Sequence, residues 1–194
     1  TVTGSQADGY LTVWPCDQPQ PNASNLNFRR GVDVPNLVTV GLGADGGVDV
    51  FSSQWAHAVV DVVGWYASGF VPVQPARRAD TREGLGGVIL LAGETREIDV
   101  AGRGGVPPAG AAAVALNVTA VGAWGPGYLT VWPTGAERPV ASNLNFVTGQ
   151  TIANAVVVGV GANGRIRIFN SSAATNVIVD VAGWFRSGFM PVTP

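Results

Sequence analysis

The sequence contains no lysine, one cysteine and one histidine, and only 12% of its residues are charged. Without lysine, neither a Schiff base nor a lysine general base is available. Cys16 alone excludes an intrachain disulfide and a zinc site built on cysteines, and His57 alone is too few ligands for a zinc site built on histidines. No apolar run reaches the roughly 18 residues of a membrane span, so we expect no insertion into a membrane.

Positive charge is also sparse. Eleven arginines are spread along the chain, and the formal net charge is −2. Nucleic acids and anionic membranes are usually met by a basic patch, so we do not expect either as a partner. Hydrophobic residues, by contrast, make up 46% of the chain, which is ample for an ordered core.

The strongest feature of the sequence is an internal repeat. The segment GYLTVWP at 9–15 recurs at 127–133, and ASNLNF at 23–28 recurs at 141–146, both 118 residues later. After one extra residue near Asn170, the offset becomes 119. Self-similarity at a fixed period indicates a duplicated structural unit.

The register of the repeat predicts that its first copy is incomplete. Residues 61–75 align with 180–194, but nothing in the first copy corresponds to residues 76–118. We therefore expect residues 1–75 to form a first module without its leading strands, and residues 76–194 to form a complete second module. Three arrangements are open: the strands are lost, they come from elsewhere, or the first module shares one core with the second.

The pattern predicts β-structure almost throughout. Asp45-Gly46 and Asn163-Gly164 favour tight hairpin turns, because these residues accept a positive φ. About eight short strands in the second copy predict an all-β fold, a β-sandwich of Greek-key or jelly-roll type, with a barrel or prism as the alternative. The expected strands include residues 37–43, 48–51, 88–92, 95–101, 112–121, 155–161, 165–169 and 176–184.

Side-chain alternation along the repeated motifs suggests a ligand-binding face. If the two motifs pair as a hairpin with leucine and valine inward, an aromatic and amide face points outward. Flat rings accept the C–H face of a sugar, and amides bridge its hydroxyls. In the alternative, the rings lie beneath loops and the asparagines bind buried backbone groups. The candidate residues are Tyr10, Thr12, Trp14, Asn25 and Asn27, repeated as Tyr128, Thr130, Trp132, Asn143 and Asn145.

Two carboxylates lie in strands that otherwise look buried. Asp61 and Asp180 are equivalent positions in apolar runs. A buried carboxylate needs a cation or several donors, and Arg82 is the candidate partner of Asp180. Asn36 and Asn154, also equivalent, are expected to bind neighbouring polar groups in the same way.

No catalytic or metal site is predicted. His57 and Cys16 are replaced by Asn176 and Thr134 in the second copy, so a nucleophile assisted by histidine has no support from the repeat. No Asp-rich loop of EF-hand type is present, which leaves only a structural calcium ion open. The glycine-rich segment 102–105 lacks the features of a phosphate loop. We expect no cofactor.

The order of motifs resembles a repeat module of large secreted actinobacterial proteins. The resemblance rests on RRADTR at 77–82, GRGGVP at 102–107, LNVT at 116–119 and DVAGWF at 180–185, together with the two repeated motifs. It implies an exported protein, secreted or at the cell surface, built from tandem units, and it carries no catalytic residues.

Two functions follow from these observations. The first is a non-catalytic extracellular module that binds glycan or cell-wall polysaccharide through the aromatic and asparagine faces. The alternative is a structural repeat of a surface stalk, adhesin or fibre, whose partners are neighbouring copies of the same repeat. Such repeats would associate by strand pairing or by stacking.

Overall fold

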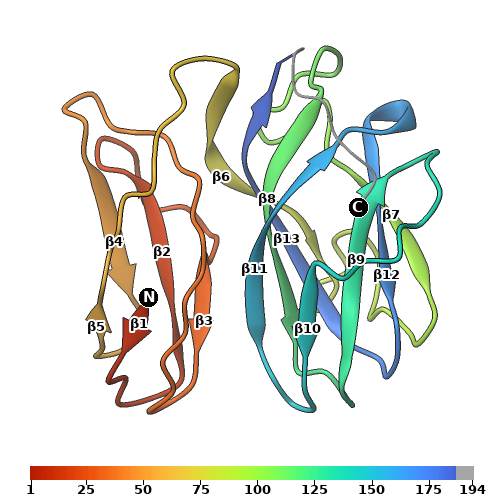
Figure 1. Ribbon diagram of the computed structural model, residues 1–194, viewed down its shortest axis with the longest axis horizontal. Helices are drawn as coiled ribbons and strands as arrows, with labels where there is room; N and C mark the ends of the chain where they lie inside the picture. The colour runs from red at the N-terminus through yellow and green to blue at the C-terminus, as the bar shows by residue number, and fades with distance from the viewer. Residues whose placement is uncertain (187–194) are drawn as a thin grey trace.

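The C-terminal part of the chain is a β-sandwich. The computed structural model describes residues 1–186, and within that range it contains strands and one short 3₁₀ turn but no α-helix (Figure 1). The predicted all-β sandwich is therefore confirmed. Its strands are β6 (Phe70–Asp80), β7 (Thr95–Asp99), β8 (Ala113–Val121), β9 (Gly127–Pro133), β10 (Leu144–Phe146), β11 (Ile152–Gly159), β12 (Arg165–Asn170) and β13 (Asn176–Phe185).

These eight strands form two antiparallel sheets in jelly-roll order. One sheet has the order β10-β9-β12-β7 and the other β11-β8-β13-β6. Apart from the paired strands β9 and β10, consecutive strands alternate between the sheets, as in two nested Greek keys. The alternating residues Val114, Leu116 and Val118 of β8 point inward to a core shared by both sheets. We call residues 70–185 the C-terminal sandwich.

The N-terminal part, residues 1–69, reproduces about half of this architecture. Its strands are β1 (Val2–Thr3), β2 (Gly9–Pro15), β3 (Leu26–Phe28), β4 (Val48–Ser52) and β5 (His57–Ala58). The sheet β3-β2-β4 has the order of β10-β9-β12. The pairs Gly9–Phe28 and Gly127–Phe146 open the β2–β3 and β9–β10 ladders in the same register. The predicted pairing of the two repeated motifs is thus confirmed in both copies.

The N-terminal part has a small hydrophobic cluster of its own. Val2, Leu11, Leu26 and Phe28 are buried together, apart from the large cluster of the sandwich. Among the described residues, the two hydrophobic clusters are thus separate from each other. The predicted boundary after residue 75 falls inside β6, which leads from the N-terminal part into the sandwich (Figure 1).

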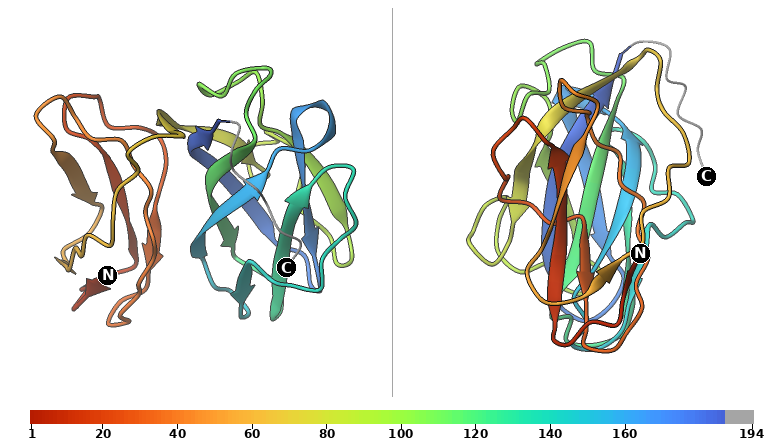
Figure 2. Two further views of the ribbon diagram at one scale, coloured as in Figure 1. Left: turned by 45° about the horizontal axis from the view of Figure 1, so that its top comes forward. Right: turned by 90° about the vertical axis from the view of Figure 1, so that its left-hand side faces the viewer.

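The N-terminal part packs on the outer side of the sheet β11-β8-β13-β6, and Figure 2 shows the sheets arranged one behind another. Strand β8 is consequently covered on both faces, and all of its residues except Val121 are buried. The repeat stacks one copy on the other through a middle sheet. Among the residues that the structure describes, no helix has the length and apolar character needed to cross a membrane.

Two predicted strands and both predicted hairpins are wrong. Asn163 and Gly164 do adopt positive φ values of 58° and 72°, but the turn carries the chain from β11 in one sheet to β12 in the other, so no hairpin forms. Turn residues determine the local dihedral angles and do not choose the strand's partner. Residues 37–43 and 88–92 form no strand, although Leu90 makes a single bridge with Thr175.

Candidate functional site

The two repeated tryptophans are buried, so the predicted solvent-exposed aromatic face is wrong at these positions. Trp14 is 8% exposed and Trp132 is 5% exposed. Their indole N–H groups donate to backbone carbonyls of the loops that follow, Trp14 to Gln18 at 2.9 Å and Trp132 to Ala136 at 3.1 Å. The loop after each strand folds back over the ring and satisfies its only polar group.

The threonines of the same face are also structural. Thr12 donates its hydroxyl to the carbonyl of Ala23 at 2.7 Å, and Thr130 donates to Ala141 at 2.6 Å. Both side chains are buried. Their hydrogen bonds hold the returning loop against the strand, which leaves no hydroxyl free for a ligand.

Asparagine side chains of the same motif also bind backbone groups. The Oδ1 atoms of Asn25 and Asn143 accept from the backbone N–H of Val13 and Val131, each at 2.7 Å. The predicted hydrogen-bonding role of Asn36 and Asn154 is confirmed, because their amides donate to the carbonyls of Asn25 and Asn143. Of the candidate residues, only the half-exposed Tyr10 and Tyr128, the exposed Asn145 and the partly buried Asn27 and Asn143 reach solvent.

Asp180 is buried as predicted, but the prediction of Arg82 as its partner is wrong. Nε of Arg77, in the adjacent strand β6, lies 3.0 Å from Oδ1 of Asp180. Arg82 instead binds Asp80, which is fully buried, and Arg77 reaches Asp80 as well at 3.1 Å. The sequence contains three arginines in this stretch, Arg77, Arg78 and Arg82, and only the strand register selects Arg77.

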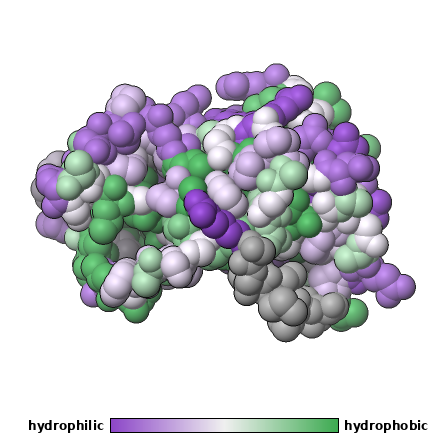
Figure 3. Space-filling model, turned by 90° about the horizontal axis from the view of Figure 1, so that it is seen from above, coloured by the Kyte–Doolittle hydropathy of each residue, from purple (hydrophilic) through white to green (hydrophobic). Residues whose placement is uncertain are grey.

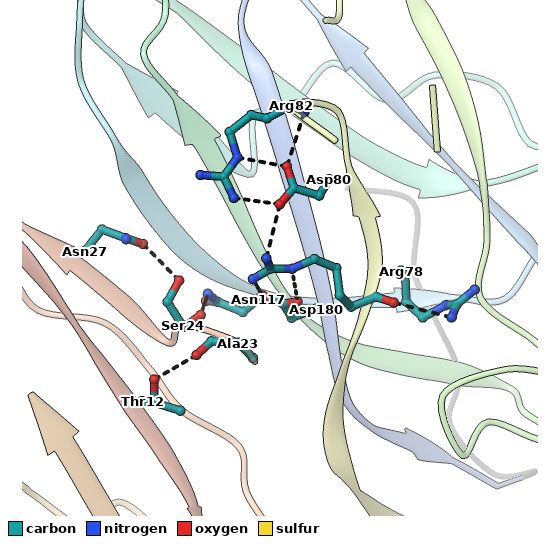
Figure 4. A network of polar contacts seen from close by, with 10 residues as sticks. Thr12, Ala23, Ser24, Asn27, Arg78, Asp80, Arg82, Asn117 and Asp180 are labelled. Carbon is teal, nitrogen blue, oxygen red and sulfur yellow. Dashed lines mark hydrogen bonds and ion pairs between the residues drawn. The ribbon is translucent and has the colours of Figure 1, made fainter. Parts of the chain in front are cut away.

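Burial and charge act on these two carboxylates in opposite directions. Burial raises the pKa of Asp180, and this effect exceeds the opposing effects of the hydrogen bond and positive charge of Arg77. The hydrogen bond from Arg82 lowers the pKa of Asp80. Figure 4 shows the network beside the contact between the two copies, where Asn117 of β8 donates to the carbonyl of Ser24.

The contact between the copies is polar at its centre. Asn36 donates to Oδ1 of Asn117 at 3.1 Å and accepts from the backbone N–H of Ala155 at 3.2 Å. A cavity of about 60 Å³ lies beside it, lined by Asn25, Leu37 and residues of β8 and β11. The cavity is too small for a sugar or a cofactor, so this surface joins protein to protein.

The single cysteine and histidine do not form a reactive pair in the structure. The Sγ atom of Cys16 donates to Oδ1 of Asp45 at 2.7 Å, and this hydrogen bond raises the pKa of the thiol. A raised pKa disfavours the nucleophilic thiolate. The ring of His57 packs edge-on against Trp55. The described residues contain no group of three or more His, Cys, Asp or Glu side chains that could hold a metal ion.

An open hollow of about 580 Å³ lies over the sheet β10-β9-β12-β7. Its lining includes Glu97, Arg138 and Arg167. Glu97 pairs with Arg167 at 2.9 Å, and Arg138 lies over the ring of Phe169. The first copy has glutamine and aspartate where Arg138 and Arg167 stand, so this hollow is not a shared property of the repeat.

The most unusual surface is the apolar segment 59–66, with the sequence VVDVVGWY. It aligns residue for residue with 178–185 of β13, yet Val62 is 87% exposed whereas its equivalent Val181 is fully buried. Asp61 is exposed too, so its predicted burial is wrong. Figure 3 shows hydrophobic side chains gathered on the N-terminal part, at the left of the view.

The repeated motifs do not predict the exposure of this apolar segment. The signal was available in the register of the repeat, since the strands that would cover 59–66 correspond to residues missing from the first copy. In comparisons with known proteins, no family model and no curated sequence matches the chain.

Proposed function

We propose that the protein is a non-catalytic structural repeat unit of an exported or surface-associated assembly. Its task is to stack on, and pair strands with, further repeats of its own kind. The supporting observation is the stacked pair within the chain, where one copy covers the outer face of β8 in the other. In this proposal the partners are neighbouring repeats, and neither nucleic acid nor membrane is bound.

Stacking through polar side chains suits a repeat assembly. Asn36 and Asn117 satisfy one another and two backbone groups at the contact. Because leaving a buried amide unpaired costs about 1–3 kcal/mol, such a contact favours one relative placement of two copies over sliding ones. Repeat proteins obtain extended rigid shapes from nearest-neighbour contacts of this type.

Glycan binding is the second candidate. The observation that favours it is the equal partial exposure of Tyr10 and Tyr128, 38% and 39%, at equivalent positions. The burial of Trp14 and Trp132 removes the two largest flat rings of the predicted face. We therefore place structural stacking first.

The test of the proposal separates the two copies physically. Ala115 is buried beside the contact cavity on the outer face of β8, so Ala115→Arg should push the N-terminal part away without disturbing the inner core. We expect a larger radius of gyration by X-ray scattering and loss of a single cooperative unfolding transition. Val140→Arg, at a fully exposed position, is the matched control and should leave both unchanged.

The same preparations discriminate the second candidate. Structural stacking predicts no retention on cell-wall polysaccharide for the wild type or for a Tyr10→Ala/Tyr128→Ala variant. Retention of the wild type that this double variant loses would contradict the proposal and support glycan binding.

A further inference from the structure

The exposed segment 59–66 has a fully described counterpart that shows how such a sequence is normally covered. In the C-terminal sandwich, β13 lies between β8 and β6 and bonds to both. In the N-terminal part, no described strand lies beside residues 60–66. Backbone groups that are hydrogen-bonded in β13 therefore have no strand partner in residues 60–66, and the apolar side chains there have no covering strand.

A short ladder already sets the register for a missing neighbour. Strands β1 and β5 pair Val2 with Ala58, and Thr1 and Val59 exchange two hydrogen bonds of 2.8 Å. By the repeat offsets, these pairs correspond to Ala120–Val177 and Thr119–Ile178 of the β8–β13 ladder. A strand resembling the rest of β8 would continue this ladder along residues 60–66, with the same irregularity that the β8–β13 ladder has between Val181 and Gly183.

A second open edge lies in the other sheet. β12 is flanked by β9 and β7, whereas its counterpart β4 has only β2 beside it in the described residues. Val50, in the middle of β4, is exposed. One connected segment with the order β6, β7, β8 would therefore meet both open edges, as it does in the C-terminal sandwich.

The negative charge of Asp61 favours a polypeptide strand with an arginine as the partner of this segment. Asp61 is exposed in the middle of the apolar segment, and its equivalent Asp180 is held by Arg77 of β6 at 3.0 Å. A lipid or a detergent-like ligand would place acyl chains against this carboxylate. A β6-type strand would place an arginine there.

We propose that the N-terminal part binds a polypeptide segment of the type of residues 70–118, which supplies strands like β6, β7 and β8 and closes a second jelly roll. This inference rests on the proposed function and names the partner of its strand pairing. The donor must be a segment not yet folded into a sandwich, because β6 and β8 of a folded second copy are already bonded to β13.

One position distinguishes the preferred donor from residues 70–118 themselves. In the sandwich Arg167 pairs with Glu97 of β7. The repeat places Asp49 where Arg167 stands, so an unchanged β7-type strand would set two carboxylates opposite each other. Like charges directly opposite are unfavourable in a sheet. The preferred donor therefore carries a basic or neutral residue at this place.

The experiment adds a synthetic segment of residues 70–118 to the full chain and measures binding by calorimetry and by tryptophan emission, to which Trp65, 82% exposed, contributes. We expect a one-to-one complex with a blue shift. Glu97→Lys in the segment should tighten binding several-fold, and Arg77→Gln should weaken it about tenfold. In the chain, Val62→Asp should abolish binding, whereas Val140→Asp at another exposed valine should not.

A fused form guards against a segment that aggregates in isolation. Residues 70–118 joined directly ahead of Thr1 keep the repeat register, and hydrogen exchange at residues 60–66 should then slow about a hundredfold or more. Binding of neither the free nor the fused segment would overturn the inference. The inference would also be overturned if the chain alone formed dimers and the Val62→Asp variant did not. The occupant would then be a second copy of the chain. Neither result bears on stacking within the chain, which the Ala115→Arg variant tests separately.

Discussion

Val181→Asp should destabilise the C-terminal sandwich by on the order of 4 kcal/mol or prevent its folding, because it places an unpaired carboxylate in a closed apolar core. Val181 is fully buried in the large hydrophobic cluster. The same substitution at the equivalent position of the first copy, Val62→Asp, should change the free energy of unfolding by less than about 0.5 kcal/mol, as for other exposed sites.

Urea denaturation of both variants beside the wild type measures this difference. The pair is a matched comparison, since the residue, its repeat position and the substitution are the same, and only the neighbouring strands differ. Equal losses in the two variants would mean that segment 59–66 is covered within the chain, contrary to the structure.

Arg77→Ala should cost about 3 kcal/mol. Arg77 is the cation beside the buried Asp180 and also contacts Asp80. Removing one partner of a buried ion pair leaves the other charge desolvated and unpaired. The difference in the free energy of unfolding between the wild type and Arg77→Ala should become smaller as the pH falls toward about 3.9, the pKa of an aspartate in the unfolded chain. Burial already raises the pKa of Asp180 in the folded state, so the folded protein binds its proton more readily than the unfolded chain does and gains relative stability on acidification.

Thermal unfolding at several pH values measures this loss, and a second variant tests its cause. Arg77→Met with Asp180→Leu replaces both charges by apolar groups of similar size and should recover most of the stability. Arg82→Ala, which removes the half-exposed partner of Asp80, should cost less than Arg77→Ala. A double variant as unstable as Arg77→Ala alone would show that the arginine acts through packing and not through charge.

The sheet content and the pairing of the repeated motifs could be predicted from the sequence because they depend on local patterns. Leu11 and Leu26 alternate with polar neighbours, and period-two alternation specifies which face of a strand is buried. Local patterns do not predict which strand pairs with which. Asn163 and Gly164 adopt the expected backbone angles, yet the chain after them enters the opposite sheet, because jelly-roll connections cross between sheets.

The predicted exposure of the aromatic face was wrong for a related reason. Alternation correctly separates Trp14 from Leu11 and Val13 in side-chain direction, but a face that points away from the core can still be covered by a loop. The loop after β2 returns over Trp14 and accepts its N–H. Nothing in the strand pattern predicts the path of that loop. Similarly, the choice of Arg77 over Arg82 for Asp180 depends on the β6–β13 register, which includes a bulge between Val179 and Asp180.

Native-state hydrogen exchange of the two equivalent segments in dilute solution of the unmodified chain tests the account most directly. It compares the amides of residues 60–66 with those of 179–185, where the β8 and β6 ladders protect β13. The account predicts exchange near the unprotected rate in the first segment and strong protection in the second. Comparable protection of both segments in a monomer would contradict it.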